Sequence, residues 1–207
     1  LVFGADWRKH GRILKNGKEI QIRTPHDAVK NGIGYNSEDR KTLGLALQLS
    51  VADNIALPNW EKFTFHGVVN EKEQTRTTTE MAKRVTVKTP SVKQLVGNLS
   101  GGNQQKVAIA KWLLRDCDVL IFDEAVSGLD VLVRKHILDL LKRLHQERKM
   151  TCFFITHDLD VALYLADRVM VMRCGKIIED RTFHGSTDCF THPYTKLLLH
   201  SIAPYLG

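Results

Sequence analysis

The sequence lacks three features that would point to particular protein classes. No apolar run approaches the roughly 20 residues that a membrane-spanning helix needs, and aromatic residues make up only 7% of the 207 positions. The four cysteines are scattered without a C-x-x-C pair (Cys117, Cys152, Cys174 and Cys189). This spacing argues against a zinc site or a disulfide framework and favours a reducing compartment.

A concentrated block of positive charge is also missing. The formal net charge is +7, but lysines and arginines are spread singly among acids and threonines, as in "EKEQTRTTTEMAKRV" at residues 71–85. This pattern indicates a solvated basic surface rather than a nucleic-acid-binding face, so no nucleic acid is expected as a partner. The length suits one sizeable α/β domain, or a domain with a small inserted subdomain.

The first hundred residues carry clear turn and strand signals. Alternating apolar and polar residues flank Asn16-Gly17, which predicts a β-hairpin over 11–24. A short helix is expected after Pro25, ended by Gly32, and "IGYN" at 33–36 is typical of a buried strand. Residues 41–97 are polar and helical in patches, which indicates an inserted helical subdomain.

From residue 98 onward, helical and strand patterns alternate. The expected elements are a helix at 102–114, a strand at 118–124, a helix at 131–149, a strand at 151–158, a helix at 159–167 and a strand pair at 168–180. Strands that alternate with helices predict a parallel sheet with helices packed on its faces. The predicted fold class is therefore α/β.

Three polar residues follow strands of this predicted sheet. Asp123 and Glu124 come directly after "VLIF", and His157 follows "CFFIT". Ligands of parallel sheets bind beyond the carboxyl ends of the strands. An Asp there can hold Mg²⁺, an adjacent Glu can orient an attacking water, and a histidine can hydrogen-bond a phosphate. The alternatives are acids that cap the next helix, and a histidine that merely starts a helix beside Asp158.

The stretch "NLSGGNQQK" at 98–106 predicts an anion site at a helix start. Ser100 is a suitable N-cap, and Gly101 and Gly102 let the backbone approach an anion closely. The positive end of the helix dipole favours the same ligand. Taken alone, the stretch is also compatible with an ordinary capped helix.

Four motifs in order resemble those of the nucleotide-binding domain of ABC transporters. "LSGGNQQK" is similar to the signature motif, "VLIFDE" to the Walker B strand, "SGLD" to the D-loop and "ITHD" to the histidine loop. The resemblance implies a P-loop NTPase-like ABC ATPase core with an inserted helical subdomain, and ATP and Mg²⁺ as cofactors. In this family two domains pack head to tail, and each signature motif closes over the ATP held by the other domain.

Carried onto this sequence, the resemblance implies roles for particular residues. Those at the signature motif and the D-loop are cofactor-binding: Ser100, Gly101 and Gly102 would grip the γ-phosphate of ATP on the partner, Gln104 would lie near the nucleotide, and Asp130 would act across the dimer interface. Asp123 would hold the metal, and Glu124 and His157 would be catalytic.

One motif of the family is not found. The phosphate loop (Walker A) needs G-x-x-x-x-G-K-[ST], and the nearest stretch, "GRILKNGKE" at 11–19, has one residue too many, lacks the Ser or Thr and falls in the predicted hairpin. The resemblance places "LVFGAD" shortly after that loop. Because the chain also opens on Leu1 rather than Met, we expect an N-terminally truncated core with Walker A absent.

Different parts of the chain resemble different importers. "IRTPHDAVKNGIGYNSEDRKTLGL" and the signature helix resemble the second ATPase half of ribose- and galactose-type monosaccharide importers, in which a Glu, here the cofactor-binding candidate Glu38, replaces the Gln of the Q-loop. From Phe122 onward, "DEAVSGLD", "FFITHDLD" and "THPYTKLLLHSIAP" look more like peptide and nickel importers. The transported solute is therefore left open.

The resemblance implies an ATP-binding subunit or half of an ABC importer, cytoplasmic and peripheral on the inner face of the plasma membrane. Its expected partners are a second ABC ATPase domain and transmembrane permease subunits. Expected segments are 1–40 for the N-terminal core, 41–114 for the helical subdomain, 115–180 for the α/β core and 181–207 for the tail. Two alternatives are a non-hydrolysing donor of the signature motif and a soluble ABC ATPase that acts on nucleic acid or ribosomes.

Overall fold

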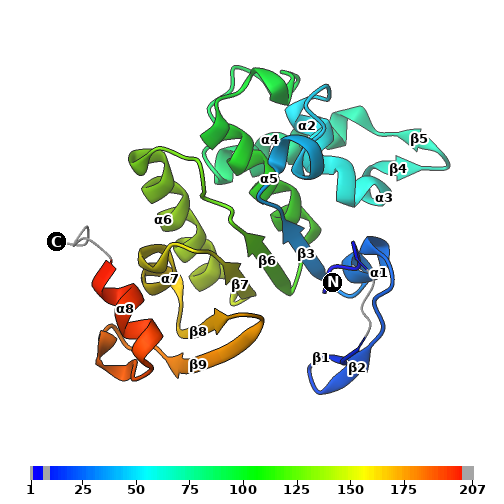
Figure 1. Ribbon diagram of the computed structural model, residues 1–207. Helices are drawn as coiled ribbons and strands as arrows, with labels where there is room; N and C mark the ends of the chain where they lie inside the picture. The colour runs from blue at the N-terminus through cyan, green and yellow to red at the C-terminus, as the bar shows by residue number, and fades with distance from the viewer. Residues whose placement is uncertain (1, 7–9, 202–207) are drawn as a thin grey trace. The chain divides into compact units, whose positions relative to one another are not determined.

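The computed structural model describes residues 2–6 and 10–201, and the chain divides into two compact units, residues 1–153 and 154–207 (Figure 1). Leu1 and the last three residues of the predicted tail segment "THPYTKLLLHSIAP" lie outside the described residues. The four-segment division expected from the sequence stays a prediction. Within residues 2–6 and 10–201, no helix combines the length and apolar character that crossing a membrane requires.

The predicted hairpin is confirmed. Strands β1 (Ile13–Lys15) and β2 (Lys18–Ile20) pair antiparallel, with Ile13 opposite Ile20. Both turn residues adopt left-handed backbone angles, with φ of 51° at Asn16 and 75° at Gly17. Such angles match the twist of the flanking strands, which is why Asn-Gly is favoured there.

The short helix after the hairpin is confirmed as α1 (Pro25–Lys30). It begins with a reciprocal capping box. The Thr24 hydroxyl accepts a hydrogen bond from the Asp27 backbone N–H at 3.3 Å, and the Asp27 carboxylate accepts one from the Thr24 N–H at 3.0 Å. Both unpaired donors of the first turn are thereby satisfied. Gly32, with a φ of 71°, follows the end of the helix.

Three strands form a sheet with the order β3-β6-β7. Its strands are β3 (Ile33–Asn36), β6 (Val119–Asp123) and β7 (Thr151–Ile155). Strands β3 and β6 pair in parallel, with Asn36 opposite Phe122; the alternating pattern from residue 98 onward predicts a parallel sheet but does not assign β3 to it. Their carboxyl ends therefore meet at one edge of the sheet.

Helices dominate residues 41–115, as predicted. They are α2 (Val51–Ala56), α3 (Trp60–Phe63), α4 (Glu71–Arg84) and α5 (Gly101–Arg115), joined by short turns that include a π-helical turn at Arg40–Gly44. Helix α2 packs against both α4 and α5. Apolar side chains of both α2 and α5 are fully buried, among them Val51, Ile55 and Ile109.

One element of this subdomain was not expected from the sequence. Strands β4 (Thr64–Phe65) and β5 (Val68–Val69) form a small antiparallel hairpin that projects from the helices (Figure 1). Its turn residues, His66 and Gly67, both have positive φ. Strands of two residues are too short to show the alternation by which strands are recognised.

Helix α6 (Val131–Arg148) follows the sheet strand β6 and is capped at both ends. The Asp130 carboxylate accepts a hydrogen bond from the Val133 N–H at 3.0 Å. At the other end, Lys149 turns the chain with a φ of 51°. The apolar face of the helix buries Ile137, Leu141 and Leu144.

The second unit consists of α7 (Leu159–Leu165), the antiparallel strands β8 (Arg168–Arg173) and β9 (Lys176–Thr182), and α8 (Pro193–Ser201). This confirms the predicted helix and strand pair. Its small core is built on Val169, Val171 and Phe190.

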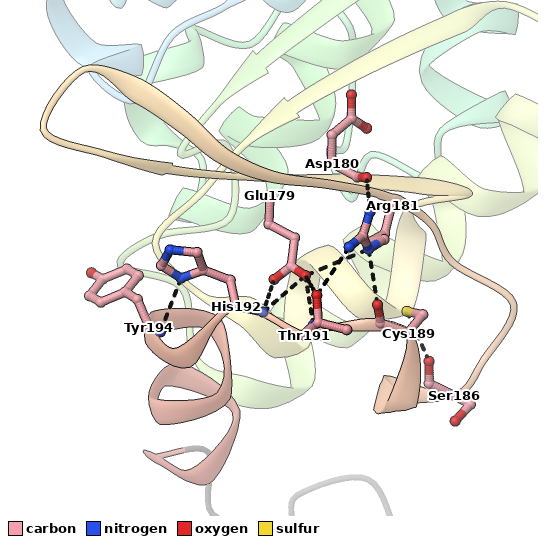
Figure 2. A network of polar contacts seen from close by, with 8 residues as sticks. All are labelled: Glu179, Asp180, Arg181, Ser186, Cys189, Thr191, His192 and Tyr194. Atoms are coloured by element: carbon pink, nitrogen blue, oxygen red, sulfur yellow. Dashed lines mark hydrogen bonds and ion pairs between the residues drawn. The ribbon is translucent and has the colours of Figure 1, made fainter.

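A buried carboxylate joins β9 to the start of α8. Glu179 accepts hydrogen bonds from the backbone N–H groups of Thr191, at 2.7 Å, and His192, at 3.2 Å (Figure 2). Burial by itself would raise the pKa of Glu179, but the nearby Thr195 hydroxyl and the donors of Thr191 and His192 outweigh it, so the pKa falls to about 2. The carboxylate therefore stays ionised and fixes the chain at the entry to α8.

Candidate functional site

The carboxyl ends of β3 and β6 bring Tyr35 and Asp123 together. The Tyr35 hydroxyl donates a hydrogen bond of 2.7 Å to Asp123 Oδ2. The ring of Phe3 stacks on Tyr35 with a centroid separation of 5.3 Å. Burial, followed by the hydrogen bond to Asp123, raises the pKa of Tyr35, so the phenol remains a donor. Sequence reasoning missed Tyr35, whose only signal was its place on a neighbouring parallel strand.

Glu124 begins a tight turn directly after β6. Its φ is 48°, a left-handed conformation that is uncommon for residues other than glycine. The Glu124 carbonyl accepts hydrogen bonds from the Ser127 N–H at 3.0 Å and the Ser127 hydroxyl at 2.7 Å. Because Ala125 and Val126 inside the turn are buried, surrounding structure holds this conformation in place. Such backbone angles are frequent at functional sites.

The alternative that these acids cap the next helix is not supported by the structure. The N-cap of α6 is Asp130, whose carboxylate accepts from Val133. Asp123 ends β6 and Glu124 turns the chain, so neither acid occupies the capping position. Asp130 thus has a defined structural role in addition to its predicted place at a dimer interface.

The first backbone N–H groups of α5 receive no hydrogen bond from the side chain at the N-cap position. Ser100 occupies the N-cap position, but its hydroxyl makes no capping hydrogen bond. Instead it accepts one from Asn103 Nδ2 at 3.0 Å. This corrects the expectation that the Ser100 side chain caps the helix. Helix starts leave unpaired N–H groups, and the dipole adds positive potential, so the start of α5 suits an anion such as a phosphate.

Gln104, which the resemblance places near the nucleotide, is buried inside the fold. Its Nε2 lies 3.3 Å from the Val96 carbonyl oxygen and 3.2 Å from that of Leu99, and donates to both. The side chain therefore supports the turn that leads into α5. Its predicted place beside the nucleotide rests on the resemblance alone.

Glu38 is exposed and lies just beyond the end of β3. The chain that follows it is tied to the helical subdomain at two points. The Lys111 ammonium donates to the Gly44 carbonyl, and Asn54 forms two hydrogen bonds with the backbone of Ala46, at 2.8 and 2.9 Å. Burial lowers the pKa of Lys111 to about 8. The segment after Glu38 is thereby attached to both α2 and α5.

His157 belongs to the second unit, whereas Asp123 and Glu124 belong to the first. It is exposed and follows β7. The next residue, Asp158, is the N-cap of α7 and accepts hydrogen bonds from the backbone of Asp160 and Val161. This confirms Asp158 as a capping residue, while the role of His157 remains a prediction.

The residues present can accommodate the expected metal. Among residues 2–6 and 10–201 there is no cluster of three or more His, Cys, Asp and Glu that could hold a metal ion. Mg²⁺ bound with a nucleotide, however, usually takes only one or two protein carboxylates, with phosphates and water completing its shell. Asp123, with Oδ2 held by Tyr35, fits that requirement.

Comparison with known proteins identifies the family. A family model described as "ABC transporter" matches residues 1–127. The chain belongs to the ABC transporter family. It is 44% identical over 177 residues to the xylose import ATP-binding protein XylG of Thermoanaerobacter pseudethanolicus, covering 85% of this chain and 35% of that protein. It is 44% identical to the ribose import ATP-binding protein RbsA of Lactococcus lactis, covering 85% of this chain and 36% of that protein.

Solved structures support the same fold. The dimeric ATP-binding cassette MJ0796, in a post-hydrolysis state with ADP and Pi, matches with a TM-score of 0.71 at 22% identity, over 89% of this chain and 78% of that one. CbiO1 of Clostridium perfringens, part of the ABC transporter complex cbiONQ, matches with a TM-score of 0.70 at 26% identity, over 87% of this chain and 69% of that one. The chain therefore has the ABC ATPase fold.

The comparisons also bear on the mixed resemblance seen in the sequence. The two curated relatives are named for xylose and ribose import, in agreement with the monosaccharide-type motifs. The resemblance of the C-terminal part to peptide and nickel importers finds no support in them. The chain spans about a third of the length of these relatives.

Proposed function

We propose that this ABC domain is the ATP-binding part of a monosaccharide importer and forms a composite ATP site with a second ABC ATPase domain. The observation that carries the proposal is the start of α5, where Ser100 leaves the first backbone donors without a side-chain cap. This anion-binding helix start lies in the same compact unit as the turn that bears Asp123 and Glu124.

Each residue of the site then has a specific role in binding or hydrolysis. The backbone at Ser100, Gly101 and Gly102 binds the γ-phosphate of ATP held by the second domain. Asp123, oriented by Tyr35, holds Mg²⁺, which neutralises phosphate charge when bound. Glu124 orients the attacking water and accepts its proton.

The remaining site residues support binding and assembly. His157 donates a hydrogen bond to the terminal phosphate, and Glu38 replaces the usual Gln of the Q-loop. By resemblance, Asp130 acts across the dimer interface and Gln104, whose side chain is turned into the fold, lies near the nucleotide. ATP binding closes the two domains and hydrolysis reopens them.

The partners and location follow from the family and the named relatives. A permease in the plasma membrane would contact the helical subdomain, and the domain would work on the cytoplasmic side. Trp60, 40% exposed, and Phe65, on the tip of the β4–β5 hairpin, are candidate apolar contacts. The names of the two relatives favour a pentose as solute, and the monosaccharide-type motifs add galactose as a second candidate. A peptide or nickel ion is the alternative suggested by the sequence of the tail.

The test compares two variants that block the proposed cycle at different steps, made in the intact protein. Glu124→Gln keeps the shape of the side chain but removes the base. It should lower ATP hydrolysis by about 10²–10⁴-fold while ATP still binds and still closes the dimer. Ser100→Arg places a bulky side chain where the phosphate would lie, so it should abolish both hydrolysis and ATP-dependent dimerisation.

A matched control is Ser91→Arg, which adds the same side chain at an exposed serine of the helical subdomain and should leave hydrolysis unchanged. Wild-type hydrolysis by Glu124→Gln would refute the role of Glu124 as the base, and normal dimerisation by Ser100→Arg would refute the composite site. If the chain contributes only a signature motif, Ser100→Arg alone should impair hydrolysis. Stimulation of ATPase activity in the assembled importer by xylose, ribose, galactose or a dipeptide would then identify the class of solute.

A further inference from the structure

The first turns of α5 and α6 meet at Gly102 and Val133. A Cβ atom on Gly102 would lie less than 3.0 Å from Val133 Cγ1, and 3.6 Å from both Cβ and Cγ2 of the same residue. Real Cβ atoms essentially never approach so closely. Gly102 lies within a helix and has no positive φ, so its backbone conformation does not require glycine. The space that its missing side chain leaves is filled by Val133.

Val133 is itself held in place by the turn that precedes it. Its backbone N–H donates to Asp130 Oδ1 at 3.0 Å, and the Arg134 N–H donates to the Asp130 carbonyl at 2.8 Å. Valine in a helix has one strongly preferred χ1 rotamer, so the methyl group cannot rotate away from Gly102 without cost. The predicted D-loop is thus connected to the predicted signature motif by contacts that run from Asp130 through Val133 to Gly102.

We propose that Val133 is a positioning residue for the signature motif. Contact with its side chain holds the start of α5 at a fixed position relative to the turn that carries Asp130. Position 102 is glycine because Val133 occupies the neighbouring space. The proposal rests on the proposed function, because the direction of the backbone donors at Ser100 and Gly101 matters only if they bind a phosphate. It leaves the Gly102 backbone in the proposed phosphate site, but assigns the need for a missing side chain at position 102 to Val133 instead of to the phosphate.

The experiment is a double-mutant cycle in the intact protein. The variants are Gly102→Ala, Val133→Ala and their combination. A matched control combines Gly102→Ala with Leu132→Ala. Leu132 precedes Val133 on α6 and is 73% exposed, so shortening it gives no room to an alanine at position 102.

The first measurement needs no nucleotide. The Gln104 N–H donates to the Ser100 carbonyl at 2.9 Å, so hydrogen exchange at residues 104–107 reports how well the start of α5 is seated. Gly102→Ala should speed this exchange by about tenfold or more. Adding Val133→Ala should restore it to the level of Val133→Ala alone, whereas adding Leu132→Ala should not.

The second measurement is ATP hydrolysis by the same variants. Gly102→Ala should lose about tenfold or more, and the combination with Val133→Ala should recover to within about threefold of Val133→Ala alone. Recovery of hydrogen exchange without recovery of ATP hydrolysis would show that the nucleotide, and not Val133, requires the absence of a side chain at position 102, and would overturn the proposal. Unchanged exchange in Gly102→Ala would overturn it as well.

The two measurements separate this proposal from the proposed function. If the wild-type protein neither binds nor hydrolyses ATP, the proposed function fails. The exchange measurements still decide whether Val133 seats the helix, because they are made without nucleotide.

Discussion

Tyr35 donates a 2.7 Å hydrogen bond to Asp123, although the two residues lie 88 positions apart in the sequence. The contact forms because β3 and β6 are parallel neighbours that end at the same edge of the sheet. Hydrogen bonds to charged acceptors are stronger than those between neutral groups. Tyr35 therefore fixes the orientation of Asp123, the carboxylate that we propose holds Mg²⁺.

We expect Tyr35→Phe to weaken the metal-dependent step and leave the fold intact. The phenyl ring keeps the stacking with Phe3, whereas Asp123 loses its donor. A loss of about 1.5–3 kcal/mol for such a bond corresponds to roughly tenfold or more in activity. The measurement is ATPase activity of the intact protein as a function of Mg²⁺ concentration, which should show a higher Mg²⁺ requirement.

Tyr194→Phe is the matched control, since Tyr194 lies in the second unit under Arg173 and should not alter the Mg²⁺ requirement. An unchanged Mg²⁺ requirement in Tyr35→Phe would show that the hydroxyl does not position the metal ligand.

Lys111 should make the stability of the chain depend on pH in the alkaline range. Burial lowers its pKa to about 8 from an ordinary value of 10.5. Between these values the unfolded state keeps a proton that the native state has released, so stability rises with pH. Relative to Lys111→Met, the wild type should gain on the order of 3 kcal/mol between pH 8 and 10.5.

Urea unfolding of both proteins at a series of pH values measures this difference. Lys62→Met removes an exposed lysine of the same subdomain and should keep the wild-type pH slope. Equal slopes in the wild type and Lys111→Met would mean that the Lys111 ammonium is well solvated, contrary to its burial against Gly44.

Glu179 should hold the start of α8 in place until strongly acidic pH. Its pKa of about 2 lies below the ordinary 4.5, so its contribution is fully present above pH 4.5 and is lost as pH falls toward 2. Glu179→Gln removes the charge and turns an amide N–H toward the His192 backbone donor, while its remaining oxygen can still accept from Thr191. We expect a local destabilisation of about 2 kcal/mol, seen as faster hydrogen exchange at residues 193–199.

Asp180→Asn provides the comparison, because this neighbouring carboxylate faces Arg168 and not α8. It should leave exchange in α8 unchanged. The difference between Glu179→Gln and the wild type should shrink as pH approaches 2; a difference that persists there would argue against the ionised carboxylate as its cause.

Local signals predicted most of the elements. Asn16-Gly17 specified a hairpin because both residues tolerate positive φ. The alternation of strand and helix patterns after residue 98 predicted a parallel sheet, whereas the pairing of β6 with β3 joins segments that no local signal connects. The β4–β5 hairpin escaped prediction because two-residue strands carry no periodicity. Its turn at His66-Gly67 also has a positive φ at His66, and a histidine does not indicate such a backbone conformation as Asn-Gly does.

Residue types and their spacing are enough to specify the order of the motifs and, through them, the family, because both are properties of the chain before it folds. They also determine which residues could carry charge or bind a phosphate. Which of these residues also contact other parts of the protein depends on the folded structure. The Ser100 hydroxyl does not cap α5, and the Gln104 side chain is turned into the fold. Tyr35 donates to Asp123, and Val133 occupies the space beside Gly102. These contacts join residues far apart in the sequence, so they exist only once the parallel strands and the two helix starts have been brought together.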